Sequence, residues 1–195
     1  MAGSWDTVAG HQANIYKSTD NPSSTPFSAH DAITYYTTVG GISPQKMVLG
    51  MPIYGRAFLN TDGPGKPYSG VGAAEPPGSW EAGMWDYKAL PRPGATEYFD
   101  SNLIASWSYD PASRMMVTYD TPEAERRKSD YIKQQGLGGA MWWESSADKK
   151  GDPSLIGIVA NALGGAGYTG LDQTENLLSY PQSKYDNLRN QFPGN

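Results

Sequence analysis

Two short, almost entirely apolar runs restrict the fold of this chain more than any other feature of its sequence. The first covers residues 47–53 and the second covers residues 138–143. Runs of this length are typical of strands that are buried on both faces, as in a parallel sheet. Pro52 cannot donate a hydrogen bond to a ladder, so the first strand is expected to end there.

Segments with helical periodicity flank these two strands. Ser28 is placed to cap a helix that has Asp31 in its first turn and that ends at Gly40. A second helix is expected to follow Thr121, its N-cap, and to end at Gly136. Helices that alternate with parallel strands define an α/β fold.

The apolar stripe of the second helix is thin. Ala124, Tyr131 and Ile132 trace it, and Lys128 falls on the same face, along which its aliphatic stem is expected to lie. We therefore expect this helix to be only half covered. A third helix is expected to open at Asp152 and to close at the glycines that begin with Gly164.

The segment between the two strands differs from them in amino-acid composition. Residues 59–114 are rich in Gly, Pro, Ser, Trp and Tyr, and the alternation at 105–109 predicts a small antiparallel sheet. The chain is therefore expected to consist of a barrel part at 1–58, an inserted subdomain at 59–114 and a second barrel part at 115–195. Two strands are too few for a complete eight-stranded barrel, which needs roughly 250 residues.

The polar tail carries a short amphipathic patch, which we expect to form a peripheral helix or a wrapped terminus. The patch consists of Leu177, Leu178, Tyr185 and Leu188.

The composition excludes several classes of function. The chain has no cysteine, which excludes disulfide scaffolds, iron–sulfur clusters and Cys nucleophiles. A net charge of −5 and the lack of a long apolar run oppose a nucleic-acid or membrane partner. His11 and His30 are too far apart for a local ligand pair, and no metal or cofactor is expected. The 13 Tyr and 6 Trp suit a surface that stacks on sugar rings, although Tyr at the rim of an edge-rich fold is the plainer interpretation.

The end of the first strand carries one candidate site. Tyr54 and Arg56 alternate, so both can point to one side of the strand, and Gly55 leaves room between them. Working groups in barrel-like folds lie at the carboxyl ends of strands. The alternative is a structural Arg56 that pairs with a carboxylate.

The end of the second strand and the insertion carry two more. Trp142 and Trp143 should point to opposite faces, and one of them can form the floor for a sugar ring. The alternative is that both are core residues. Residues 80–86 of the insertion can supply a carboxylate and an aromatic wall, or else form a loop with a solvated Glu81.

Established catalytic constellations are not evident. Glycoside hydrolysis needs a carboxylic acid with a second carboxylate or a substrate group nearby. The chain offers no tight acidic cluster on a buried strand, no G-x-S-x-G and no P-loop. A G-x-G-x-x-G match at 165–170 follows a helix instead of a strand, so we interpret it as a helix stop. The carboxylates available in the candidate regions are Glu81, Asp86, Glu144 and Asp148.

Four motifs occur in an order that resembles a known family. They are A-G-S-W-D at 2–6, L-G-M-P-I-Y-G-R at 49–56, E-A-G-M at 81–84 and G-L-G-G-A-M-W-W at 136–143. Together they resemble the C-terminal half of a family-18 glycoside hydrolase, most nearly the secreted fungal endochitinases. The resemblance covers essentially the whole chain. It implies a partial TIM (β/α)8 barrel, with the last strands and helices and a small α+β insertion domain.

The resemblance also implies substrate-binding residues in the barrel part. Tyr54 and Arg56 match the Y-G-R positions that line the cleft. Trp143 matches the Trp of the eighth strand that forms the floor of the −1 subsite, because it is the second residue after Met141. Met141 is included in the expected site.

Three more expected contacts come from the other motifs. Glu81 matches a carboxylate of the insertion domain that hydrogen-bonds the sugar, and Met84 lies beside it. Trp5 matches a stacking position at the +1 and +2 subsites. The resemblance therefore implies chitin or N-acetylglucosamine oligosaccharides as the partner.

The departures from the family pattern limit the expected activity. In this family the acid is the last Glu of a D-x-x-D-x-D-x-E motif, and the N-acetyl group of the substrate acts as the nucleophile. That motif does not occur in the 195 residues. We therefore expect the C-terminal part of a secreted, retaining chitinase, monomeric, with no catalytic residue of its own and no turnover alone. The alternatives are a lectin-like fragment that binds chito-oligosaccharides and a fragment that does not fold alone.

Overall fold

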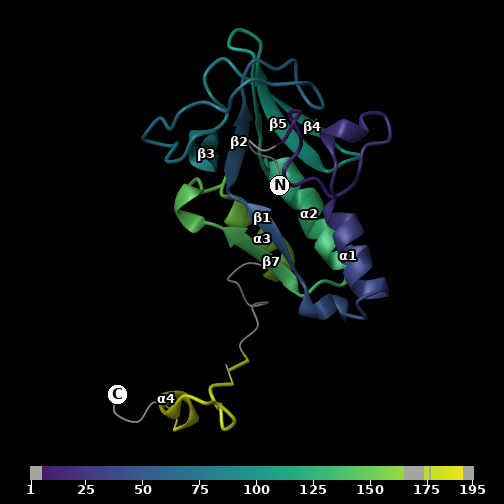
Figure 1. Ribbon diagram of the computed structural model, residues 1–195, viewed down its shortest axis with the longest axis vertical. Coiled ribbons are helices and arrows are strands. Elements are labelled where there is room, and N and C mark those ends of the chain that lie inside the picture. The colour runs from purple at the N-terminus through teal and green to yellow at the C-terminus, as the bar shows by residue number, and fades with distance from the viewer. Residues whose placement is uncertain (1–5, 165–173, 176, 191–195) are drawn as a thin grey trace.

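The computed structural model describes residues 6–164, 174–175 and 177–190, in two sheets with helices packed against them (Figure 1). Short 3-10 turns lie at Pro22–Ser24 (η1), Pro44–Lys46 (η2), Tyr87–Ala89 (η3) and Ser145–Ala147 (η4). The helices are α1 (Ala29–Thr38), α2 (Pro122–Gln135), α3 (Leu155–Gly164) and α4 (Asp186–Arg189). The strands are β1 (Val48–Pro52), β2 (Tyr54–Phe58), β3 (Met84–Asp86), β4 (Thr96–Asp100), β5 (Ala105–Asp110), β6 (Met115–Thr118) and β7 (Gly139–Trp143).

The two apolar runs form a parallel pair, as the sequence predicts. β1 and β7 pair in register from Val48 opposite Gly139 to Pro52 opposite Trp143, and β1 ends at Pro52. The expectation that both faces are buried is wrong. Burial alternates along β1, and on β7 Met141 and Trp143 are exposed, because the helices of the described chain cover one face of this two-stranded sheet.

The remaining strands form an antiparallel sheet in the order β3-β2-β6-β5-β4. The alternation at 105–109 is confirmed as β5, which pairs with β4 and β6. The sheet begins at Tyr54 and ends at Thr118, so it extends beyond both ends of the segment expected as the insertion. The division of the chain into domains stays a prediction.

The helix caps follow the sequence closely. The Ser28 hydroxyl accepts a hydrogen bond from the Asp31 N–H at 3.1 Å, which caps α1. The Thr121 hydroxyl accepts from the Ala124 N–H and caps α2, and Gly136 ends this helix in the left-handed conformation at φ 62°. A left-handed residue after a helix favours glycine, which has no Cβ to clash with the backbone.

The third helix begins later than expected. α3 starts at Leu155, whereas Asp152 lies in a preceding turn. The Asp148 carboxylate accepts from the N–H groups of Leu155 and Ile156, at 3.0 and 3.2 Å, and the Ser154 hydroxyl accepts from the Gly157 N–H at 2.9 Å. These acceptors satisfy N–H groups that have no partner inside a helix, so they fix where it starts.

The covering of α2 is greater than expected. Lys128 is only 1% exposed, and its ammonium pairs with the Asp120 carboxylate at 2.5 Å instead of reaching solvent. Glu125 and Ser129 of the same helix are also buried. The expectation that the Lys128 stem runs along a half-covered surface is therefore wrong, because Asp120, which follows β6, provides a buried partner for the charge.

Two of the three hydrophobic clusters among the described residues join the sheets to the helices. One lies between the antiparallel sheet and the start of α3, and it includes Val117, Tyr119 and Leu155. The other lies between the parallel pair, α2 and α3. Trp142 packs against both clusters. This residue thus links the two sheets, and its neighbour Trp143 lies on the opposite, exposed face of β7.

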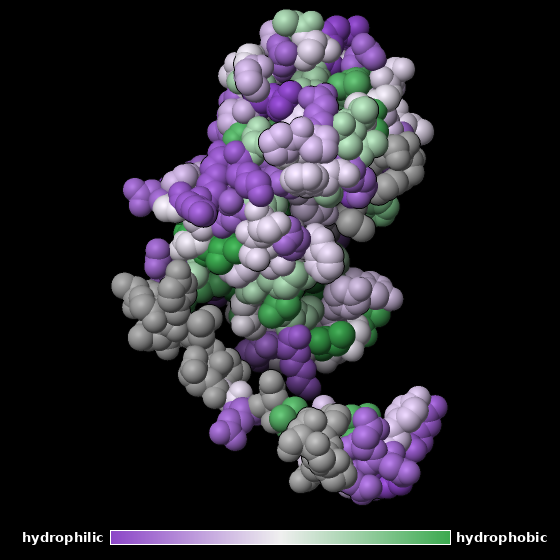
Figure 2. Space-filling model, turned by 90° about the vertical axis from the view of Figure 1, so that its left-hand side faces the viewer, coloured by the Kyte–Doolittle hydropathy of each residue, from purple (hydrophilic) through white to green (hydrophobic). Residues whose placement is uncertain are grey.

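The surface carries apolar residues in addition to the polar ones. Figure 2 shows hydrophobic residues gathered over the middle and lower part of the main body, below a hydrophilic region. The amphipathic patch of the tail does not pack as a wrapped terminus, since Leu177, Leu178 and Tyr185 are all exposed. None of the helices in the described part of the chain has the length and apolar character needed to cross a bilayer.

Candidate functional site

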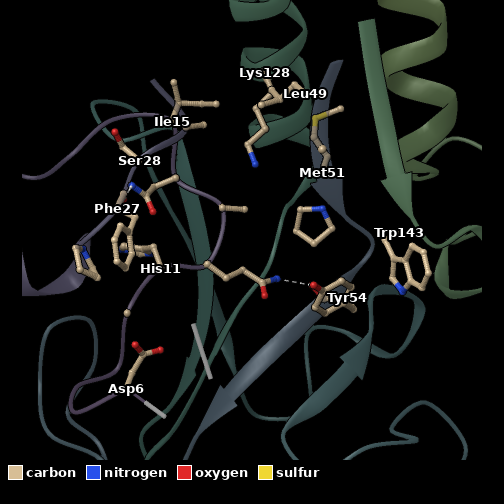
Figure 3. A pocket seen from close by; sticks show the side chains of 18 of the residues that line it. Asp6, His11, Ile15, Phe27, Ser28, Leu49, Met51, Tyr54, Lys128 and Trp143 are labelled. Atoms are coloured by element: carbon tan, nitrogen blue, oxygen red, sulfur yellow. Dashed lines mark hydrogen bonds between the residues drawn. The ribbon is translucent and has the colours of Figure 1, made fainter. Parts of the chain in front are cut away.

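A pocket of about 650 Å³ lies where the N-terminal loop passes the parallel pair. Leu49 and Met51 line it from β1, and Met141 and Trp143 line it from β7. Tyr54, at the start of β2, lies on the same side as Trp143, and Phe27 lies on the opposite side (Figure 3). Most of the surface is apolar, as in sites that bind a ring face.

Trp143, whose role as the floor of a sugar site stays a prediction, lines the pocket from the end of β7. It is the last residue of β7 and it is 70% exposed, while Met141 lies two residues earlier on the same face and also lines the pocket. Trp142 points the other way, into the core. An exposed indole at the end of a strand can stack on the face of a pyranose ring.

Tyr54 and Arg56 point to the same side of β2, as predicted. The guanidinium carbon of Arg56 lies 5.4 Å from the centroid of the Tyr54 ring, and Arg56 Nη1 lies 3.0 Å from Glu81 Oε1. Gly55 is buried between them, where a Cβ would meet Val117 at 2.5 Å. Arg56 therefore pairs with a carboxylate, as the alternative interpretation of this residue expects. Glu81 remains exposed, so the pair can still offer donors and acceptors to a ligand.

Met84 is held beside this pair by a tight turn. Its N–H donates to the Glu81 carbonyl at 3.0 Å, and it lies opposite Arg56 in the pairing of β2 with β3. Gly83 adopts φ 71°, and a Cβ there would meet the Val71 side chain at 2.6 Å. The turn therefore requires glycine, and it places Glu81 and Met84 beside Arg56, in the middle of β2.

The sequence reasoning did not assign Trp80 to the site. Its side chain is 61% exposed, and its indole N–H donates to the Asp86 carboxylate at 3.1 Å. Asp86 itself is buried and lies opposite Tyr54 in the sheet. Trp80 is therefore an exposed aromatic ring with a fixed polar edge, next to Glu81. The sequence does contain a signal for this residue, because it predicts that residues 80–86 can supply an aromatic wall.

Gln12 was also missed. Its side-chain amide donates to the Tyr54 carbonyl at 2.7 Å, and its backbone N–H donates to the Thr118 hydroxyl at 3.3 Å. Gln12 thus ties the N-terminal loop to β2 and β6 at the edge of the pocket. A glutamine in a loop carries no pattern in sequence that would reveal this contact.

His11 lines the pocket but is almost completely buried. Burial lowers its pKa from 6.5 to about 4, against the weaker opposing effect of the Asp100 carboxylate. Its ring meets Trp107 edge-on at 5.1 Å, and its Nδ1 has no hydrogen-bond partner within the described residues. His11 is therefore neutral at pH 7 and acts as an aromatic wall.

The carboxylates named from the sequence have separate structural partners. Hydrogen bonds from the Ser146 hydroxyl and N–H lower the pKa of Glu144, which is exposed. Asp148 caps α3, Asp86 accepts from Trp80, and Glu81 pairs with Arg56. No group of three potential metal ligands occurs in the part of the chain that the structure describes. An ionised, exposed Glu144 is poorly suited to act as a general acid near neutral pH.

Two of the sequence predictions lie outside the described residues. These are Trp5, expected as a stacking position, and the glycine motif at 165–170. Both remain predictions.

The parallel strand pair, the antiparallel sheet and the helices packed on them define an α/β class of protein, and comparisons identify the family. A family model described as glycosyl hydrolases family 18 matches residues 1–148. The chain belongs to this family. It is 50% identical over 192 residues to Endochitinase 1 of Metarhizium robertsii and 48% identical over 188 residues to Chitinase 1 of Aphanocladium album. The alignments cover 98% and 96% of this chain, but only 43% and 42% of those proteins.

Solved structures give the same result. The catalytic domain of the psychrophilic chitinase B from Arthrobacter TAD20 aligns with a TM-score of 0.71 and 31% identity, over 87% of this chain and 37% of that one. A plant class V chitinase mutant from Cycas revoluta, solved with (GlcNAc)3, aligns with a TM-score of 0.65 and 28% identity, over 83% of this chain and 43% of that one. The fold is therefore α/β and corresponds to part of a (β/α)8 barrel. The chain spans less than half the length of these relatives.

Proposed function

We propose that this chain supplies the sugar-binding wall of a chitinase that hydrolyses β-1,4 links between N-acetylglucosamine units. The observation that carries the proposal is the row of Tyr54, Arg56 and Glu81 beside the exposed Trp143. An indole face packs against the C–H groups of a pyranose, while the guanidinium and carboxylate offer hydrogen bonds to its hydroxyl and acetamido groups. The family membership and the (GlcNAc)3 bound by a related chitinase support this ligand class.

The reaction of the whole protein follows the retaining, substrate-assisted scheme. A carboxylic acid protonates the leaving oxygen, and the N-acetyl carbonyl of the substrate attacks the anomeric carbon. The D-x-x-D-x-D-x-E motif of the acid is not in this sequence, and the carboxylates here have other partners. The role of this chain is thus to bind and orient the sugar through Trp143, Tyr54, Arg56, Glu81 and, beside them, Met84 and Met141.

The same site gives a second candidate function. Binding of chito-oligosaccharides without turnover, as in a lectin, is favoured by the exposed Trp143 and by the absence of the acid motif from the sequence.

We assign the whole protein to the secreted, monomeric chitinases, and residues 59–114 to its α+β insertion.

Hydrolysis of a fluorogenic chito-oligosaccharide and calorimetric binding of chitohexaose by the purified chain test the proposal together. We expect binding that Trp143→Ala weakens at least about tenfold, and no release of the fluorophore. Release that depends on Glu81 or Glu144 would contradict the assignment of the acid to another part of the protein. Absence of any binding by a folded chain would contradict the sugar-binding wall itself. Tyr36→Ala, which changes an exposed aromatic ring on α1, is the matched control.

A further inference from the structure

Lys88 connects the two elements that carry the exposed tryptophans. It lies in η3, directly after β3. Its Nζ lies 2.7 Å from the carbonyl oxygen of Ser146 and 3.3 Å from Asp86 Oδ2. One ammonium therefore bridges the insertion sheet and the turn that follows β7.

The Asp86 end of this bridge fixes Trp80. The same oxygen, Asp86 Oδ2, accepts from the Trp80 indole N–H at 3.1 Å. Asp86 is buried, so its carboxylate has little freedom to move, and the exposed Trp80 ring takes its orientation from it. The Lys88 ammonium, 3.3 Å from Asp86 Oδ2, attracts this carboxylate and helps to hold it in place.

The Ser146 end fixes the segment that follows Trp143. Ser146 lies in η4, and its N–H and hydroxyl both donate to the Glu144 carboxylate, at 3.1 and 2.5 Å. Glu144 is the residue after Trp143. The contacts of Lys88 thus extend from Trp80 through Asp86 to Ser146 and reach the strand end that carries Trp143.

A series of contacts in the candidate site also joins the segment of Trp80 to Trp143. Glu81 follows Trp80 and pairs with Arg56, Arg56 lies over Tyr54, and Tyr54 lines the pocket together with Trp143. A sugar chain long enough to follow these side chains can contact both indoles. The spacing of the two rings then decides how well a long chain fits.

We propose that Lys88 is a positioning residue that sets the spacing of Trp80 and Trp143, and thereby the preference for oligosaccharides long enough to contact both rings. This inference rests on the proposed function. Preorganised rings cost a ligand less ordering free energy than mobile ones, so the effect should appear in affinity. Lys88 is partly exposed but Asp86 is buried, so thermal unfolding of each variant is measured beside its affinity.

The ligand-free test uses Lys88→Met, which removes the charge and keeps the stem. The chain has 6 Trp, so 5-fluorotryptophan labelling gives six fluorine NMR resonances, which Trp80→Phe and Trp143→Phe assign. We expect Lys88→Met to shift or broaden the resonances of both Trp80 and Trp143, and Lys88→Arg to restore them. Lys46→Met, at an exposed lysine of η2, is the control and should move neither. Unmoved resonances, or a change at Trp80 alone, would overturn the proposal that Lys88 positions both tryptophans.

The ligand test compares chitobiose with chitohexaose by calorimetry. We expect Lys88→Met to weaken hexaose binding about tenfold and disaccharide binding less than about twofold, in protein that thermal unfolding shows to be folded at the temperature of the measurement. An equal loss for both lengths, or none, would overturn the role in length preference. If the unaltered chain binds neither sugar, the proposed function fails and the length preference fails with it, whereas the fluorine spectra still decide whether Lys88 positions both tryptophans.

Discussion

Lys128 and Asp120 form a buried ion pair, with Nζ 2.5 Å from Oδ2 and both side chains only 2% exposed. Asp120 follows the last strand of the antiparallel sheet, and Lys128 lies on α2, at the pocket wall. The pair therefore joins the sheet to the helix behind the candidate site. Burying two charges is favourable only when each compensates the other.

Removing one partner of this pair should strongly destabilise the chain. Lys128→Met leaves the Asp120 carboxylate buried without a counter-charge, and we expect a loss of about 3–5 kcal/mol in the free energy of unfolding. Urea denaturation at pH 7 measures it. Lys133→Met, at an exposed lysine of the same helix, should cost less than about 1 kcal/mol. Asp120→Asn combined with Lys128→Met should recover much of the loss, and equal stability of Lys128→Met and the unaltered chain would refute the account.

Glu125 should make stability fall as pH rises. Its side chain is fully buried, and neither carboxylate oxygen has a partner within the described residues. Burial, reinforced by the charge of Asp120, raises the pKa of Glu125 well above its usual value. The folded state thus holds this proton more tightly than the unfolded state, so stability decreases from the ordinary carboxyl pKa, about 4.3, up through the raised one.

The measurement is the urea midpoint between pH 4 and pH 8. Glu125→Gln should remove the decrease, because an amide does not titrate. Glu123→Gln, on the exposed side of the same helix, should leave it in place. A decrease that persists unchanged in Glu125→Gln would show that another group causes it.

His11 should have the opposite effect. Its folded pKa is lowered to about 4 from 6.5, so the folded state binds this proton less tightly than the unfolded state. Stability therefore rises with pH between about 4 and 6.5, by roughly 3 kcal/mol for a shift of this size. His11→Phe keeps an aromatic ring against Trp107 and should flatten the rise. His30→Phe is the control, and an equal flattening there would argue against His11.

The sequence predicts where helices begin and end better than it predicts which side chains are buried. Ser28, Thr121 and Gly136 fix helix ends through hydrogen bonds and backbone conformation within a few residues, and these predictions are confirmed. The burial of Lys128 depends on Asp120, which lies eight residues earlier and outside the helix, so helical periodicity alone gave the wrong environment. The start of α3 was missed for the same reason, since the Asp148 carboxylate binds N–H groups seven and eight residues later.

In the candidate site, too, the sequence predicts the local geometry but not the contacts between distant segments. Alternation on a strand predicts that Tyr54 and Arg56 share a side and that Trp142 and Trp143 do not. The partner of Arg56 was left open, because Glu81 comes from another segment. Gln12 was missed, since its role depends on a carbonyl acceptor 42 residues away. Contacts between distant segments are what the sequence pattern could not specify.

The two adjacent tryptophans of β7 should separate stability from binding. Trp142 packs against both hydrophobic clusters, so Trp142→Ala leaves a cavity between the sheets and should cost about 3–5 kcal/mol. Trp143 is 70% exposed, so Trp143→Ala should change the free energy of unfolding by less than about 1 kcal/mol.

The affinities should follow the reverse order. Loss of the stacking face in Trp143→Ala should reduce the affinity for chitohexaose at least about tenfold, since truncating a central aromatic contact typically costs more than 1 kcal/mol. Trp142→Phe refills most of the core volume and should bind as the unaltered chain does, which separates the loss of a sugar contact from the loss of fold. Calorimetry and thermal unfolding on the same samples provide both quantities. If Trp142→Phe lost affinity and Trp143→Ala kept it, the sugar-binding face of β7 would have to be assigned to the opposite side of the strand.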